Sequence, residues 1–227
     1  MFGKQSIHLL IFPSAYQCNA TFLRFQEHYE SPKFAGKIFD WEEYMDWCAE
    51  QRGNFTYFED WSGFNLPGRV LEVFYAGKFD PLTRKERALL DIFENVKGNF
   101  YVIGTYREDG LWTIRHEIIR GLFYLFPDYR RAVREAISGC DTSAIKEILL
   151  GSCGYSRKVL VDEINAYLTS SRGRPVINSK KLPAYKKLKQ SLKNLFRESF
   201  GFSPDCNNEY RWLEFVQVHR IPPLRTK

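Results

Sequence analysis

Cysteine and histidine, whose side chains most often bind transition metals, are scarce in this sequence. Only five cysteines and four histidines occur among 227 residues. The cysteines are widely spaced and include no C-x-x-C pair, which excludes the usual zinc knuckles and dithiol redox motifs. An odd number of widely spaced cysteines favours reduced intracellular thiols over a disulfide framework. We therefore expect a cytoplasmic protein.

Long apolar runs are also missing. The ~18 consecutive apolar residues that span a bilayer occur nowhere, so we expect no association with a membrane. The apolar run at residues 7–12 is short, contains a histidine and meets Pro13, which favours a core strand over a targeting signal. Glycine-rich phosphate loops of either common spacing are absent, which excludes the standard nucleotide-binding motifs.

Positive charge, by contrast, is concentrated in one segment. The net charge is +6, yet residues 172–197 contain nine basic residues and no acidic residue. The pattern at residues 183–199 predicts a basic amphipathic helix. This segment makes nucleic acid an alternative partner, and its candidate contacts are Lys180, Lys181, Lys186, Lys187, Lys189 and Lys193.

Two aromatic residues of the basic segment bear on that alternative. Tyr185 and Phe196 are placed to stack on bases if the segment binds nucleic acid. The competing interpretation is a solvated helix face, with leucines such as Leu188 and Leu192 packed inward.

The pattern along the chain changes near its middle. The first half is predicted to contain strands at residues 7–12 and 99–106, helices at 40–51 and 84–95, and a strand or extended loop at 54–60. Asp40 is expected to cap the first of these helices, and Thr83 and Glu86 to form a capping box at the second. Turns are expected at residues 63–68 and 109–110, and a loop at 170–175. The second half is predicted to contain helices at 111–125, 128–138, 142–150, 158–169 and 183–199, and a strand at 213–218. We predict an α+β protein, a single domain with a mixed lobe at 1–110 and a mainly helical lobe at 111–227.

The helix predicted at residues 111–125 contains a motif with one altered letter. Residues 116–120 read His-Glu-Ile-Ile-Arg, where a zinc hydrolase helix has His-Glu-x-x-His. Positions i and i+4 share one helix face, so two histidines there point at one metal. The neighbouring glutamate accepts a proton from the metal-bound water. His116 and Glu117 fit the first ligand and the base, and Arg120 stands at the second ligand position.

A second acidic helix follows some forty residues later. Asp162 and Glu163 lie within the apolar helix predicted at 158–169, and Ala166 follows Glu163 by three positions. A small residue at that spacing allows a neighbouring helix to approach closely.

Together these segments resemble the gluzincin branch of the zincin-like metallopeptidases. That family has a glutamate helix of the form E-x-x-A after its motif helix. The resemblance implies His116 as first zinc ligand, Glu117 as general base and Glu163 as third ligand. The stretch from Arg115 to Leu125 also resembles uncharacterised bacterial proteins with histidine at the fifth motif position. The resemblance covers about residues 100–170.

Arg120 is the departure that decides the chemistry. Arginine stays protonated and offers only donors, so it cannot bind zinc. We therefore expect no cofactor, and zinc only if the site is unexpectedly intact. Arg120 is instead predicted to lie between Glu117 and Glu163 as an ion pair that replaces the metal, with Arg115 and Asp162 as further members of the same cluster.

The resulting hypothesis is a zincin-like protein with a degenerate metal site and a non-peptidase binding or regulatory role. Its partner would be a protein, or an acidic ligand that uses Arg120 and Arg115. One alternative is an active zinc hydrolase in which His219 or Asp162 supplies the missing ligand. The simplest competing interpretation has no site: His116 is an ordinary histidine at a helix surface, and the helix acids lie on a solvated face.

Overall fold

Four strands form one mixed sheet, in the order β2-β3-β1-β4. The structure, a computed structural model, describes residues 6–106, 111–151, 155–170 and 184–224. The strands are β1 (Ile7–Phe12), β2 (Gly63–Pro67), β3 (Tyr101–Tyr106) and β4 (Val216–Arg220). β2 and β3 are antiparallel, with Gly63 opposite Thr105. This sheet, together with the many helices, confirms the predicted α+β class.

The helices fall into two groups along the chain. Before β3 lie α1 (Ala15–Glu30), α2 (Trp41–Arg52), α3 (Tyr57–Asp60), η1 (Gly68–Leu71), α4 (Glu72–Tyr75) and α5 (Arg84–Phe93). After β3 come α6 (Leu111–Leu125), α7 (Pro127–Ser138), α8 (Ser143–Gly151), η2 (Arg157–Val159), α9 (Leu160–Thr169), α10 (Ala184–Phe200) and α11 (Glu209–Leu213). Among the described residues, no helix is long and apolar enough to cross a membrane.

The chain divides into two compact units near the expected boundary at residue 110. The helical unit comprises Met1–Ile7 and Gly110–Val216, and the sheet unit comprises His8–Asp109 and Gln217–Lys227. The difference from the predicted lobes lies at the ends of the chain. The last strand, β4, pairs with β1 and so joins the sheet unit instead of the helical half that precedes it.

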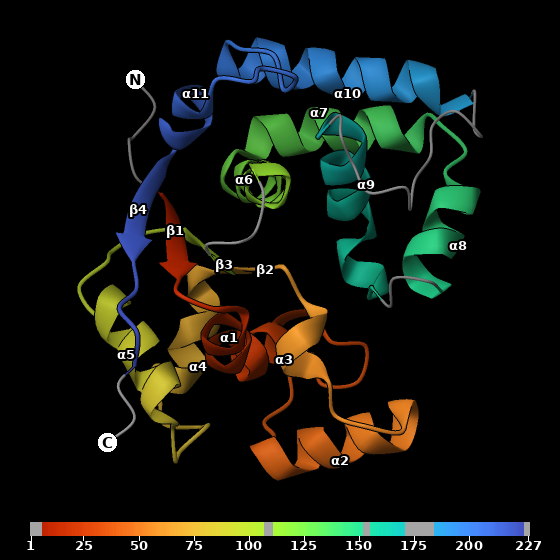
Figure 1. The fold of residues 1–227 in the computed structure, drawn as a ribbon. Coiled ribbons are helices and arrows are strands. Elements are labelled where there is room, and N and C mark those ends of the chain that lie inside the picture. The colour runs from red at the N-terminus through yellow and green to blue at the C-terminus, as the bar shows by residue number, and fades with distance from the viewer. Residues whose placement is uncertain (1–5, 107–110, 152–154, 171–183, 225–227) are drawn as a thin grey trace. The chain divides into compact units, whose positions relative to one another are not determined.

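The core of the sheet unit is aromatic, and α1 packs against the sheet (Figure 1). The ring of Phe22 on α1 lies so close to Gly104 of β3 that an added Cβ there would come within 2.3 Å of it. The glycine therefore sets the distance between helix and sheet. Phe22 also stacks on Phe64 of β2, with ring centroids 5.2 Å apart. The richness in aromatic residues thus serves the core of this unit.

The helical unit is built around α6, α7, α9 and α10. α6 packs against α9 and α7, and α10 lies along α7 and also contacts α9 (Figure 1). The buried face of α6 includes Ile118, Ile119 and Leu122, and that of α10 includes Leu188 and Leu192. The apolar residues whose spacing predicted these helices are the residues that are buried when the helices pack.

Several predicted helix starts are confirmed by their capping contacts. The Asp40 carboxylate accepts a hydrogen bond from the Glu43 N–H at 2.8 Å and begins α2. Thr83 and Glu86 form the predicted capping box of α5. The turn expected at Asp109 and Gly110 and the loop expected after Ser170 lie outside the described residues.

Two predictions in the first half differ from the structure. Residues 57–60 form the short helix α3 instead of a strand or extended loop, and residues 63–67 form β2 instead of turns. Helix α1 was not predicted at all. Its buried face includes Gln17, Asn19 and Thr21, so apolar periodicity does not mark it.

Candidate functional site

α6 and α9 bring the predicted site residues together inside the helical unit. His116, Glu117 and Arg120 lie on α6, and Asp162 and Glu163 lie on the first turn of α9. His116 and Arg120 are one turn apart on the same face, as the spacing predicts. The side chain of Glu163 is fully buried, and those of His116 and Arg120 are 4% and 2% exposed.

Arg120 is the centre of this group. Its Nε donates a hydrogen bond to Asp162 Oδ2 at 2.8 Å. Its Nη1 lies 2.7 Å from Glu163 Oε1 and 3.9 Å from Glu117 Oε2. The contact with Glu163 is an ion pair without hydrogen-bond alignment, since Glu163 Oε1 has no hydrogen-bond partner among the described residues. Three carboxylates thus surround one guanidinium, and we call these four residues and His116 the Arg120 cluster.

His116 contacts the second carboxylate oxygen of Glu163. Its Nε2 lies 3.2 Å from Glu163 Oε2, within hydrogen-bond distance. The imidazole is flanked by Tyr167, edge-on with ring centroids 4.6 Å apart, and by Trp112 at 5.3 Å. Among the described residues, His116 Nδ1 has no hydrogen-bond partner. The Glu163 carboxylate is therefore held between a histidine and an arginine.

The electrostatics of the cluster favour its charged form. Burial opposes the charged form of His116 most strongly, but the hydrogen bond and negative charge of Glu163 outweigh it and raise the pKa of His116. Burial also opposes the charged form of Glu163, yet the positive Arg120 and the hydrogen bond to His116 lower its pKa. A protonated His116 would still leave three carboxylates facing two cations.

Zinc is the metal that the gluzincin resemblance implies, and the residues present do not fit it. A catalytic zinc needs three protein ligands and an open position. Here a permanent cation lies within 2.8 Å of both Asp162 and Glu163, the carboxylates on which a metal would depend. Among the described residues, no group of three or more histidine, cysteine, aspartate or glutamate side chains is arranged to hold a metal ion.

The contacts of Arg115 differ from those that the sequence predicted. Its guanidinium lies over the ring of Trp212 at 5.5 Å, and within the described part of the chain it forms no ion pair with the cluster. Arg120 is already surrounded by carboxylates. The acidic ligand expected at these two arginines stays a prediction.

The basic segment is described only in part. Lys180 and Lys181 lie outside the described residues. On α10, Lys186 and Lys187 are exposed, while Lys193 pairs with Asp205 at 2.8 Å. Burial, and then the neighbouring Lys193, lowers the pKa of Lys189.

The aromatic residues of that helix do not face solvent. Tyr185 is 5% exposed and Phe196 is fully buried. Neither ring can stack on a base, so the prediction that they form a stacking surface is wrong. Together with the buried leucines of α10, the two buried rings favour the other interpretation. In it, the basic side chains form a solvated helix face and the apolar side chains pack inward.

His219, the candidate replacement ligand, belongs to the sheet unit. There its Nε2 lies 3.0 Å from His8 Nδ1. The ring centroids are 5.3 Å apart and the rings are inclined by 26°. Two rings that meet nitrogen to nitrogen at this distance share one hydrogen bond, so the facing nitrogens are occupied by each other.

Sequence reasoning missed a second buried arginine. Arg24 on α1 forms a bidentate pair with Glu86, both nitrogen–oxygen distances being 2.6 Å. The two residues are 62 positions apart, and the only local signal was the capping role of Glu86. Trp112 was also missed, although it lies one turn before His116 on α6.

No family model, curated protein or solved structure matches this chain. The zincin-like resemblance therefore stays a prediction.

Proposed function

We propose that this chain is a zincin-like protein in which Arg120 has replaced the metal, and that it acts as a binding or regulatory protein without peptidase activity. The observation that carries the proposal is the position of the Arg120 guanidinium. It lies 2.7 Å from Glu163, the residue that the resemblance assigns as third ligand, and on the same helix face as His116.

A cation at this position accounts for the other residues of the cluster. In a zinc site the metal neutralises the glutamate and orients the histidine. Here Arg120 neutralises Glu163, and Glu163 orients His116 through the 3.2 Å contact. An arginine cannot lower the pKa of a water as a metal does, and it offers no open coordination position. The Arg120 cluster thus lacks a metal that would activate a water nucleophile, but Arg120 takes over the metal's role of holding Glu163 and His116 in place.

The test is whether a single substitution recovers a metal site. In Arg120→His, zinc affinity should rise at least ~100-fold above that of the native chain, since even outer-shell changes alter affinity ~10–100-fold. Arg120→Gln is the matched control, because it removes the same charge without supplying a ligand. Zinc binding is measured by competition with a chromogenic chelator, and thermal unfolding is followed with and without zinc.

The outcomes separate the proposal from its alternatives. Zinc that stabilises Arg120→His but not Arg120→Gln supports the metal-site geometry. Arg120→His that folds and gains no zinc affinity reduces the cluster to an ordinary buried ion pair. Stoichiometric zinc in the native chain, lost on His116→Ala, would instead establish the active hydrolase and overturn the proposal.

A further inference from the structure

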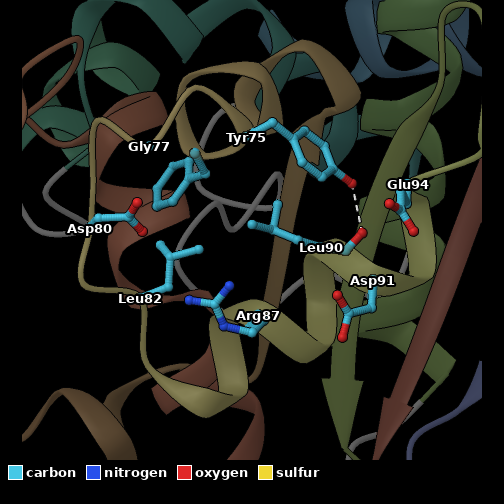
Figure 2. A pocket seen from close by; sticks show the side chains of 9 residues that line it. Tyr75, Gly77, Asp80, Leu82, Arg87, Leu90, Asp91 and Glu94 are labelled. Carbon is cyan, nitrogen blue, oxygen red and sulfur yellow. Dashed lines mark hydrogen bonds between the residues drawn. The ribbon is translucent and has the colours of Figure 1, made fainter.

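Two adjoining hollows lie in the sheet unit, on the two sides of the loop that joins α4 to α5. The larger measures about 540 Å³ and the smaller about 200 Å³, and Asp80 lines both. Figure 2 shows the smaller hollow, with Asp80 and Leu82 on one side and Asp91 and Glu94 on the other. Together they form one feature, which we call the α4–α5 groove.

The groove has apolar walls that reach the surface. The larger hollow is lined by Phe39, Trp41 and Phe79, and by Ile38, whose side chain is 48% exposed. The smaller is lined by Tyr75, which is also 48% exposed. Large exposed apolar side chains gathered at a hollow are typical of a binding surface.

The rim of the groove is strongly negative. Arg24 also lines the larger hollow, but its charge is balanced by Glu86 in the buried pair. The remaining basic groups are Lys78 and Arg87. The carboxylates that line the two hollows are Asp40, Glu42, Glu43, Asp80, Asp91 and Glu94. A partner that fits this rim is positively charged.

Hydrogen bonds from Arg24 fix the backbone of the loop that lines both hollows. Arg24 Nη1 donates to the carbonyl of Phe79 at 2.9 Å, and Nη2 donates to that of Pro81 at 3.2 Å. Gly77 has a φ of +70°, and a Cβ there would come within 3.0 Å of Asp80 Oδ2. Because this wall of the groove is already ordered, binding costs little additional conformational entropy.

We propose that the α4–α5 groove docks an extended lysine- or arginine-rich segment of a partner protein, with an apolar side chain seated in the larger hollow. Residues i and i+2 of an extended chain point to the same side. Alternating residues therefore turn the apolar side chains toward Ile38 and Trp41, while the long basic side chains on the other side bend over to the carboxylates of the rim. This proposal is independent of the Arg120 cluster and extends beyond the function proposed for it.

The experiment measures peptide binding to the full chain by fluorescence anisotropy. The probe is a short fluorescein-labelled peptide of alternating lysine and leucine. The double variant Asp80→Asn/Glu43→Gln should weaken binding about tenfold, because it removes two carboxylates of the rim. Ile38→Ser should weaken it about fivefold through the lost apolar contact. A lysine–serine peptide should bind more weakly than lysine–leucine.

The matched control is Glu50→Gln/Glu59→Gln, which removes two exposed carboxylates of the same unit that line neither hollow. It should leave affinity unchanged, and thermal melting verifies that all variants are folded. Equal weakening by both double variants would show non-specific attraction and overturn the proposal, as would no binding at low salt. Self-association of the full chain that Asp80→Asn/Glu43→Gln abolishes would make the occupant a second copy, and would also overturn it.

Discussion

The two units each bury an arginine among carboxylates, and the two arrangements differ in balance. In the sheet unit, Arg24 meets one carboxylate, that of Glu86, through two bonds of 2.6 Å, and donates its other hydrogen bonds to backbone carbonyls. In the helical unit, the Arg120 guanidinium lies within 3.9 Å of three carboxylates, those of Glu117, Asp162 and Glu163. The first arrangement matches one cation with one anion, and the second places three anions around one cation.

That difference teaches which buried charges indicate a former or present site. A pair that exists only for stability is neutral and geometrically matched, because an excess charge in the interior is costly. Three carboxylates around a single guanidinium are what the proposed replacement of a divalent cation by Arg120 would leave.

The largest effect is expected from breaking the balanced pair. Glu86→Gln leaves Arg24 as an uncompensated buried charge and removes half of a capping box, so the free energy of unfolding should fall by about 3–5 kcal/mol. Urea unfolding followed by circular dichroism measures it. Arg24→Met combined with Glu86→Leu should recover most of the loss, and a double variant as unstable as the single one would contradict this account.

The next largest effect is expected from the pH dependence of stability, and it comes from the buried carboxyl group of Glu27. Burial raises the pKa of Glu27 on α1 to about 7, although the hydroxyls of Ser31, Tyr57 and Tyr44 partly oppose the shift. The folded state therefore binds more protons than the unfolded state between about pH 4.5 and 7. Stability is highest below that window and is lost as the pH rises through it, by about 3 kcal/mol.

Glu27→Gln tests that sign directly. The variant should show no such loss between pH 5 and pH 8 in urea unfolding, and should be more stable than the native chain at pH 8. A native chain that gains stability over this window would mean that Glu27 is ionised when folded.

A smaller effect distinguishes the over-acidic cluster from the balanced pair. Glu117 Oε2 is the most distant of the carboxylate contacts of Arg120, at 3.9 Å. Glu117→Gln should therefore change the free energy of unfolding by less than about 1 kcal/mol, and in the stabilising direction, because it lowers the excess negative charge. A loss as large as that of Glu86→Gln would show that all three carboxylates are needed.

The smallest effect sets the scale for a pair at the surface. Lys193 and Asp205 lie 2.8 Å apart, with the aspartate side chain 49% exposed. Asp205→Asn should cost no more than about 1 kcal/mol, and less as salt is added. Thermal melting at low and high salt measures the difference from the buried pairs.

The parts of the structure that the sequence predicted are those with local signals. α6 and α9 have apolar stripes at helical spacing, whereas the contact of Arg120 with Glu163 was predicted only from the gluzincin resemblance of these two helices. α5 was marked by its capping box. These features need only residues within one or two turns of each other.

The parts that were missed depend on distant residues. α1 buries polar side chains because their partners come from elsewhere: Asn19 donates to the carbonyls of Tyr57, Phe58 and Trp61. The partner of Arg24 is 62 residues away. The α4–α5 groove likewise joins the start of α2 to α5, and no local pattern predicts that meeting.

The pairing of β4 with β1 has a consequence for how the chain is made. Sheet and helical units are each built from separated pieces, so neither is a continuous stretch that a ribosome could finish alone. The open edge of β1 is covered only when residues 216–220 have been synthesised. A product that stops short of them exposes an apolar strand edge to other chains. We therefore expect a chain cut before residue 216 to aggregate more readily than one that includes β4.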